Sequence, residues 1–408
     1  MGGSRGLSLG VVFLTVVINL IGFGIVLPLL PFFATDFGAS PLAVGGIIGA
    51  YSAMQFVFAP IWGRISDRHG RRIPLIFGLI GTAGSYVLFA LAGSIWVLLL
   101  SRIVGGVMGA TIPVAQAYVA DQSPREGRAK AMGLIGAAFG IGFIIGPAIG
   151  GFMSQWGYAL PGFAAAGLSL LAALVAIAFL PESLQAEKRL KPGGPTPASG
   201  VRAAGEQLRA LARTLGDDRF RGPIGATLLA NTGIAAYTTI FPLLLDDPIG
   251  MSAAEAGAFF AFAGVVSAVT QGGLVGPVVG RLGERRTAIS GTSTVVLALV
   301  VLAWAPGTGG ILASLALLGV GWGLFNPSLL GILSSRADAA DQGSVLGVNQ
   351  SASALARVIG PAAGGWAYGA LGYTIAFHAA AGLLALAALW LLALKERPPQ
   401  SAVEARGA

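Results

Sequence analysis

The sequence has no cysteine, only two histidines and few charges, since 10% of its 408 residues are Asp, Glu, Lys or Arg. Without cysteine there can be no disulfide and no thiolate metal site, and two histidines cannot form a histidine-rich one. We therefore expect no metal and no cofactor. P-loop and catalytic-nucleophile motifs are missing as well, and the 25 Lys and Arg form no basic block. We expect neither an enzyme nor a nucleic-acid-binding protein.

Apolar residues make up 55% of the chain, and the mean hydropathy is +0.80. Soluble domains carry about 25% charged residues, so the solvent of this chain is lipid. A membrane-crossing helix needs roughly 20 apolar residues. Twelve segments meet this requirement, at approximately 9–33, 43–62, 73–92, 95–119, 129–153, 160–180, 223–245, 254–279, 287–304, 310–334, 343–369 and 374–393. The sequence predicts an all-α integral membrane protein with twelve transmembrane helices.

Lys and Arg occur almost entirely in alternate loops. With both termini in the cytoplasm, 23 of the 25 lie in cytoplasmic loops or tails, and none lies in an outer loop. The other two, Arg102 and Arg357, lie within predicted helices. Membrane proteins keep Lys and Arg on the cytoplasmic side. We therefore expect a multi-pass protein of the cell (inner) membrane with both termini cytoplasmic, a monomer surrounded by membrane lipid.

The two parts of the chain repeat one pattern of small residues at an offset of 213 or 214. The matched positions are Gly63 and Gly70 with Gly276 and Gly283, Gly105, Gly109 and Pro113 with Gly319, Gly323 and Pro327, and Gly146, Pro147, Gly150 and Gly151 with Gly360, Pro361, Gly364 and Gly365. We predict two pseudo-symmetric six-helix halves, 1–180 and 223–394, with a cytoplasmic linker at 181–222 and a cytoplasmic tail at 395–408. Repeats of this kind place a substrate cavity where the halves meet.

The linker has a mixed character. Its segment from Lys191 onward, Lys-Pro-Gly-Gly-Pro-Thr-Pro, is a poor helix former. Farther on, Leu208, Leu211 and Leu215 have helical spacing. This second segment fits either a surface helix on the inner leaflet or a solvated connection.

Three motifs carry a family resemblance: Gly-Arg-Ile-Ser-Asp-Arg-His-Gly-Arg-Arg at 63–72, Leu-Leu-Ser-Arg-Ile-Val-Gly-Gly at 99–106, and Gly-Phe-Ile-Ile-Gly-Pro-Ala-Ile-Gly-Gly at 142–151. Together they resemble signature motifs of the major facilitator superfamily, and the third resembles the motif of its drug/proton antiporters. The first two helices are similar to those of tetracycline and multidrug efflux proteins. The resemblance covers all twelve helices. It implies a secondary transporter that exports small amphipathic drugs or metabolites by alternating access, with a proton or another ion as coupling partner.

The chain departs from tetracycline/proton antiporters in its acidic residues. Those proteins carry carboxylates in helices one and three, at positions that match Asn19 and Ser85 here. All 17 acidic residues of this chain lie in loops or at helix ends. We therefore expect no proton relay through these two positions, and the substrate, the driving ion and the direction of transport stay open.

Candidate gating residues come from the first and third motifs. Asp67 among its arginines can clamp the two halves in one state and release them in the other, or the basic turn only anchors topology. The small residues of the third motif allow close helix packing, and Pro147 bends its helix. The predicted gating set is Gly63, Asp67, Arg68, Gly70, Arg71, Arg72, Gly142, Gly146, Pro147, Gly150 and Gly151.

Candidate cavity residues are polar or charged side chains inside predicted helices. A cation within the membrane is costly, so Arg102 and Arg357 either bind an anionic substrate or make structural hydrogen bonds. The first reading makes the chain a carrier of an organic anion or metabolite, and a receptor or lipid scramblase on the same fold is a third possibility. Each neutral polar group also has an interhelical hydrogen bond as its alternative role. The predicted coupling and cavity set is Asn19, Tyr51, Gln55, Arg102, Gln116, Asn231, Tyr237, Asn326, Asn349 and Arg357.

Overall fold

A computed structural model describes residues 2–109, 111–123, 128–184, 200–304, 307–337 and 342–394, and within these residues there are helices and no strand. The helices are α1 (Gly2–Val26), α2 (Leu29–Asp36), α3 (Pro41–His69), α4 (Arg72–Ala90), α5 (Ile95–Met108), α6 (Thr111–Gln122), α7 (Arg128–Ser154), α8 (Ala159–Phe179), α9 (Gly200–Gly216), α10 (Arg221–Asp246), α11 (Ala253–Val269), the π-helical turn η3 (Thr270–Leu274), α12 (Val275–Trp304), α13 (Thr308–Arg336), α14 (Gln342–Leu371) and α15 (Tyr373–Leu392). The predicted all-α membrane fold is confirmed.

Twelve crossings can be followed through the described residues. Ten helical stretches are long and apolar enough to span a bilayer. One of them, 253–304, turns at Gly283, where φ is 77° and ψ is 161°, and so makes two crossings. The twelfth is α14, a helix of 30 residues whose hydropathy is lowered by Asn349, Gln350 and Arg357.

Three boundaries differ from the predicted ones. The first crossing consists of α1 and α2 on either side of Leu27 and Pro28, and the fourth consists of α5 and α6. Both breaks lie near prolines, whose missing N–H interrupts helical hydrogen bonding. The predicted basic turn is mostly helical, because α3 continues to His69 and α4 begins at Arg72. Gly70, with a φ of 92°, makes the actual turn, a conformation that glycine adopts without steric cost.

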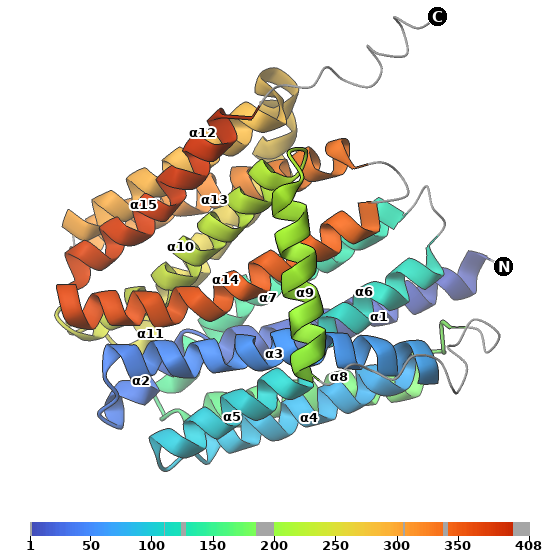
Figure 1. Cartoon of the computed structure of the whole chain (residues 1–408). Helices are drawn as coiled ribbons and strands as arrows, with labels where there is room; N and C mark the ends of the chain where they lie inside the picture. The colour runs from blue at the N-terminus through green and yellow to red at the C-terminus, as the bar shows by residue number, and fades with distance from the viewer. Residues whose placement is uncertain are drawn as a thin grey trace, which may run out of the picture.

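The crossings form two groups that lie side by side (Figure 1). In the first group α1 packs on α7 and α8, and α4 packs on α5 and α8; in the second, α10 packs on α14 and α15, and α12 packs on α13 and α15. Two helix pairs, α3 with α14 and α7 with α11, join the groups. These pairs correspond under the repeat, so the interface between the halves is pseudo-symmetric.

The repeat extends to single hydrogen bonds. Arg72 Nη2 donates to the Ile177 carbonyl at the end of α8 at 2.6 Å. At the matching place, Arg285 Nε donates to the Leu391 carbonyl at the end of α15 at 3.0 Å. Each arginine supplies a donor and a positive charge to the carbonyl end of the last helix of its half.

The two halves approach most closely at one end of the bundle, where α2, Pro41 and the start of α11 lie; we call it the distal end. The end that carries the turn at Gly70 is called the basic end. A Cβ atom placed on Gly257 of α11 would lie 2.5 Å from the Pro147 carbonyl oxygen of α7, and one on Gly45 of α3 would meet the Pro361 carbonyl oxygen of α14.

A hydrogen bond joins the halves at the same distal end, where the Thr35 hydroxyl of α2 lies 2.8 Å from Oδ2 of Asp246 of α10. Nearer the basic end, Cβ atoms placed on Gly136 and Gly140 of α7 or on Gly347 of α14 would meet open space. These glycines therefore have free space beside them, whereas glycines at the distal end pack against the opposite half and close that end.

Candidate functional site

The break in the fourth crossing is held by side chains of α3. Pro113 lacks an N–H, so the carbonyl of Gly109, four residues earlier, has no helical donor. Gln55 Nε2 donates to that carbonyl at 2.9 Å. Trp62 Nε1 donates to the Val107 carbonyl in the last turn of α5 at 2.7 Å. The predicted cavity residue Gln55 therefore supports a helix break in this state.

Substitution of Gln55 by leucine is expected to lower the free energy of unfolding by about 1–3 kcal/mol, because the buried Gly109 carbonyl loses its donor. Thermal unfolding of the purified protein in detergent, followed by tryptophan fluorescence, measures the effect. Gln271→Leu is the matched control, since Gln271 is exposed and, among the described residues, its Nε2 bonds only the Ser267 hydroxyl, at 3.0 Å. Equal melting temperatures of the two variants would contradict the assigned role.

Arg102 is buried among aromatic rings, with 4% of its surface exposed. Its guanidinium carbon lies 5.4 Å from the Phe89 ring centroid and 6.0 Å from that of Tyr86. Nε donates to the Ser101 hydroxyl at 3.2 Å, and Nη2 is buried without a hydrogen-bond partner among the described residues. Aromatic faces stabilise a cation but leave its N–H groups unused. Arg102 can therefore still donate to an anion.

Tyr51 of α3 connects Arg102 to the second intramembrane cation. Tyr51 interacts electrostatically with both Arg102 of the first half and Arg357 of the second. Its ring packs against Phe23 at a centroid distance of 5.4 Å, and a Cβ placed on Gly109 would lie 2.8 Å from its hydroxyl. Arg357 itself is exposed. The Tyr51 phenol therefore lies in the field of one guanidinium from each half, and these three groups together suit a carboxylate, sulfonate or phosphate.

Besides Gln55, three of the predicted cavity amides make hydrogen bonds within the protein. Asn349 Oδ1 accepts from the Thr227 hydroxyl at 2.6 Å, and Asn231 Nδ2 donates to the Thr227 carbonyl at 2.9 Å. Asn19 Oδ1 accepts from the Ser169 hydroxyl at 3.3 Å. In this state these side chains stabilise helix packing or their own helix.

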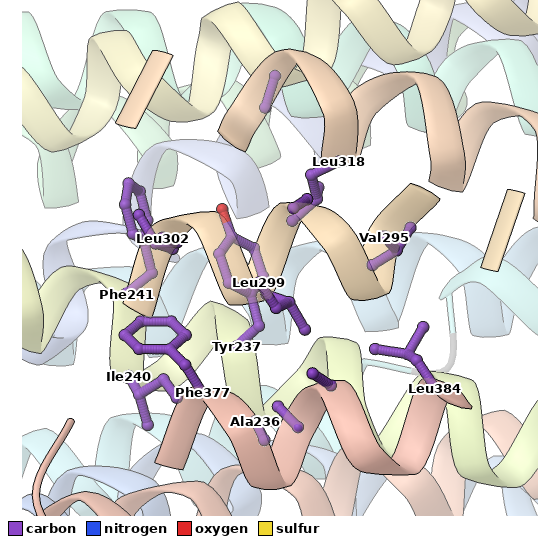
Figure 2. Packing of buried hydrophobic residues seen from close by; sticks show 14 of the residues in the cluster. Ala236, Tyr237, Ile240, Phe241, Val295, Leu299, Leu302, Leu318, Phe377 and Leu384 are labelled. Atoms are coloured by element: carbon purple, nitrogen blue, oxygen red, sulfur yellow. The ribbon is translucent and has the colours of Figure 1, made fainter. Parts of the chain in front are cut away.

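The remaining neutral residues of the cavity set are placed differently from one another. Gln116 is half-buried and Asn326 is exposed. Tyr237, expected at the cavity, lies in the core of the second half with 2% of its surface exposed. Figure 2 shows its ring among Leu299 of α12 and Phe241 of its own helix. The difference arises because α10 turns this face toward α12 and α15 and away from the other half.

The basic turn forms a charge network inside the first half. Arg71 bonds the Asp67 carboxylate and the Ser66 hydroxyl through Nη1, and the Asp121 carboxylate through Nε at 3.0 Å. Burial lowers the pKa of the Arg71 guanidinium, but the hydrogen bonds to Asp121 and Asp67 more than offset this and raise it overall. The guanidinium therefore stays charged, and its ion pairs with Asp67 and Asp121 lie within one half.

Two acidic residues of this network were not foreseen. Glu182 accepts hydrogen bonds from the N–H groups of Arg71 at 2.7 Å and Arg72 at 3.2 Å, which caps the start of α4. Asp121 ends the fourth crossing and reaches Arg71. In the sequence, each of the two is marked only by its place just after a predicted helix. Carboxylates are common at such places, so this position does not predict which residue they bind. Gly63, a member of the predicted gating set, borders open space.

The small-residue motif of α7 serves two interfaces. Gly142, Gly146 and Gly150 face α1, and a Cβ on Gly146 would lie 2.6 Å from the Cα of Gly24. Gly151 faces α11 of the other half. The motif therefore holds the first half together through three glycines and meets the second half through the fourth.

The matched motif of α14 is arranged in the same way. Gly360 and Gly364 face α10 of their own half, and Gly365 faces Pro41 of α3. The same sequence pattern thus builds both sides of the interface between the halves.

Known proteins are similar to this chain in sequence and in fold. The model of the Major Facilitator Superfamily matches residues 12–361 and 224–408. Multidrug resistance protein 2 of Bacillus subtilis (strain 168) is 32% identical over 346 residues, 85% of this chain and 84% of that protein. Tetracycline resistance protein, class C, of Escherichia coli is 32% identical over 364 residues, 85% of this chain and 86% of that protein.

A solved structure, the human organic anion transporter MFSD10 (TETRAN), has a TM-score of 0.73 at 26% identity, and the match covers 96% of this chain and 100% of that one. These relatives are transport and resistance proteins, not enzymes. The paired halves, the repeated motifs and these similarities lead to one conclusion: the chain is a multi-pass membrane transporter that belongs to the Major Facilitator Superfamily.

Proposed function

We propose that this transporter exports small amphipathic drugs or metabolites from the cytoplasm, by alternating access and in exchange for a proton or another ion. The observation that carries the proposal is the pseudo-symmetric interface between the halves. Glycine faces of α3, α7, α11 and α14 close its distal end, while Gly136, Gly140 and Gly347 nearer the basic end border open space. Relatives named for multidrug and tetracycline resistance support the choice of substrate and direction.

In the proposed cycle, the two halves rock about the interface between them. The basic end is cytoplasmic, in keeping with the Lys and Arg of its loops, so the state described here receives substrate from the cytoplasm. Rocking separates Gly257 from Pro147 at the distal end and brings the basic ends together. The charge network around Asp67 and Arg71 then changes partners, which makes it the bistable element of the cycle.

A second candidate substrate class is organic anions. Arg102 keeps an unpartnered Nη2, and within the described residues no ion pair joins Arg102 or Arg357 to a carboxylate. A negatively charged substrate would hydrogen-bond both guanidiniums and would offset the cost of holding two cations within the membrane. The similarity to a human organic anion transporter adds support. This candidate shares the cycle above and differs in the charge of the cargo.

Uptake into everted membrane vesicles tests direction and coupling together. Vesicles that contain the protein are expected to accumulate lipophilic drugs from the medium, and to do so faster under an imposed pH gradient if the proton is the coupling ion. A panel of cationic, neutral and anionic compounds separates the two candidate cargoes. No uptake of any solute, combined with lipid transfer between leaflets, would overturn both in favour of a scramblase.

Substitution of Asp67 by asparagine is expected to reduce turnover about tenfold at normal expression, because a charge-assisted hydrogen bond of about 1.5–3 kcal/mol is lost from one conformational state. Initial rates in the same vesicles measure it. Glu206→Gln is the isosteric control, since the exposed ion pair of Glu206 with Arg64, at 3.0 Å, contributes little. Wild-type turnover of Asp67→Asn would leave the basic turn as a topology anchor only.

A further inference from the structure

Helix α9 lies across both halves near the basic end. It contacts α3 of the first half and α10 and α14 of the second, and Figure 1 shows it running across the membrane-crossing helices. Because the crossings stand roughly along the membrane normal, α9 lies roughly parallel to the membrane plane. Of the two alternatives for this part of the linker, the structure forms the helix.

One face of α9 is anchored on the second half. Leu211 has 5% of its surface exposed and packs in a cluster with Phe220, Ile224, Leu333 and Val345. The helix is therefore held by apolar contact along this side, and its rotation about its own axis is set by the burial of Leu211.

The opposite face carries three arginines. Arg202, Arg209 and Arg213 are exposed, and at 3.6 residues per turn their spacing places them in one stripe directly opposite Leu211. None of the three has a hydrogen bond or ion pair with the residues that the structure describes. The acidic residue of this stripe, Glu206, forms an ion pair with Arg64 at 3.0 Å. The stripe is thus a row of unneutralised guanidiniums turned away from the protein.

We propose that Arg202, Arg209 and Arg213 bind the phosphates of anionic membrane lipids. A helix that lies parallel to the membrane at the loop end of the bundle places its outer face at headgroup depth. The planar guanidinium forms paired hydrogen bonds with phosphate oxygens. Since α9 contacts both halves, the bound headgroups line the place where the halves separate. The proposal depends on the membrane fold and is independent of the cargo.

Binding is tested with purified protein in detergent, incubated with phosphatidylglycerol or phosphatidylcholine and analysed by native mass spectrometry. The wild-type protein is expected to retain phosphatidylglycerol in preference to phosphatidylcholine, and less of it as salt increases. The variant R202Q/R209Q/R213Q keeps good helix formers on an exposed face, so α9 is preserved. Its affinity is expected to fall about a hundredfold, because one arginine near an anionic surface accounts for about fivefold.

The matched control is R281A/R286A, which removes two exposed arginines from the same end of the bundle. It is expected to retain phosphatidylglycerol like the wild type, and R202K/R209K/R213K is expected to retain part of the affinity because its charge is kept. Equal loss in the control would overturn the proposal in favour of general charge attraction. Full retention by the triple glutamine variant, or displacement of the lipid by equimolar inorganic phosphate, would also overturn it.

Discussion

Replacement of Gly257 by leucine is expected to abolish transport while both halves fold normally. The first side-chain atom at this position would lie 2.5 Å from the Pro147 carbonyl oxygen and 2.7 Å from the Cα of Gly151, both of them backbone atoms of the opposite half. Backbone atoms cannot move aside as a flexible side chain can. Overpacking of this kind costs about 1–3 kcal/mol or more, and here the cost applies only to the state with a closed distal end.

The pseudo-symmetric variant Gly45→Leu is expected to behave in the same way, since Gly45 meets the Pro361 carbonyl. Two controls separate this effect from misfolding. Gly46→Leu enters open space and is expected to be silent, whereas Gly146→Leu meets α1 within its own half and is expected to lower the yield of folded protein.

The measurements are drug uptake in everted vesicles and labelling of single cysteines placed at the distal end. The chain has no cysteine of its own, so each introduced thiol reports one position. Gly257→Leu is expected to increase distal labelling because the closed state is disfavoured. Wild-type uptake by this variant would show that the distal end need not close as tightly during transport.

Replacement of Arg357 by alanine is expected to lower kcat/KM about tenfold to a hundredfold for anionic compounds and to leave neutral ones nearly unchanged. A charge-assisted hydrogen bond contributes about 1.5–3 kcal/mol, and tenfold in affinity corresponds to about 1.4 kcal/mol. Arg357 is the better target of the two intramembrane cations because it is exposed, whereas Arg102 is buried and its removal would leave a void.

Transport of a matched set of anionic and neutral compounds measures this selectivity. Arg357→Lys keeps the charge but loses the planar guanidinium that forms paired hydrogen bonds, so an intermediate rate is expected for anions. Arg281→Ala, at an exposed position of α12, serves as the control for a lost positive charge. If Arg357→Ala impairs anionic and neutral compounds equally, the residue ties helices together and does not select cargo.

The sequence by itself determined the solvent, the number of crossings and the repeat. Hydropathy and the distribution of Lys and Arg are properties of short segments, so they can be read without knowing which helices touch. The offset of 213 or 214 residues also predicted matched structural roles. The structure has matched contacts at this offset. Arg72 and Arg285 make matching hydrogen bonds to helix ends, and the glycine faces of α7 and α14 pack in the same way.

Only the tertiary structure decided which way each helix faces. A helix that is apolar on every side can be rotated without changing its fit to lipid, so periodicity leaves its orientation open. Tyr237 was therefore expected at the cavity and lies in a core, and Gly151 differs from Gly146 in facing the opposite half. Gln55 contacts Gly109 across a sequence separation of 54 positions, and Glu182 contacts Arg71 across a separation of 111. Such contacts depend on how all twelve crossings pack, and no local pattern specifies them.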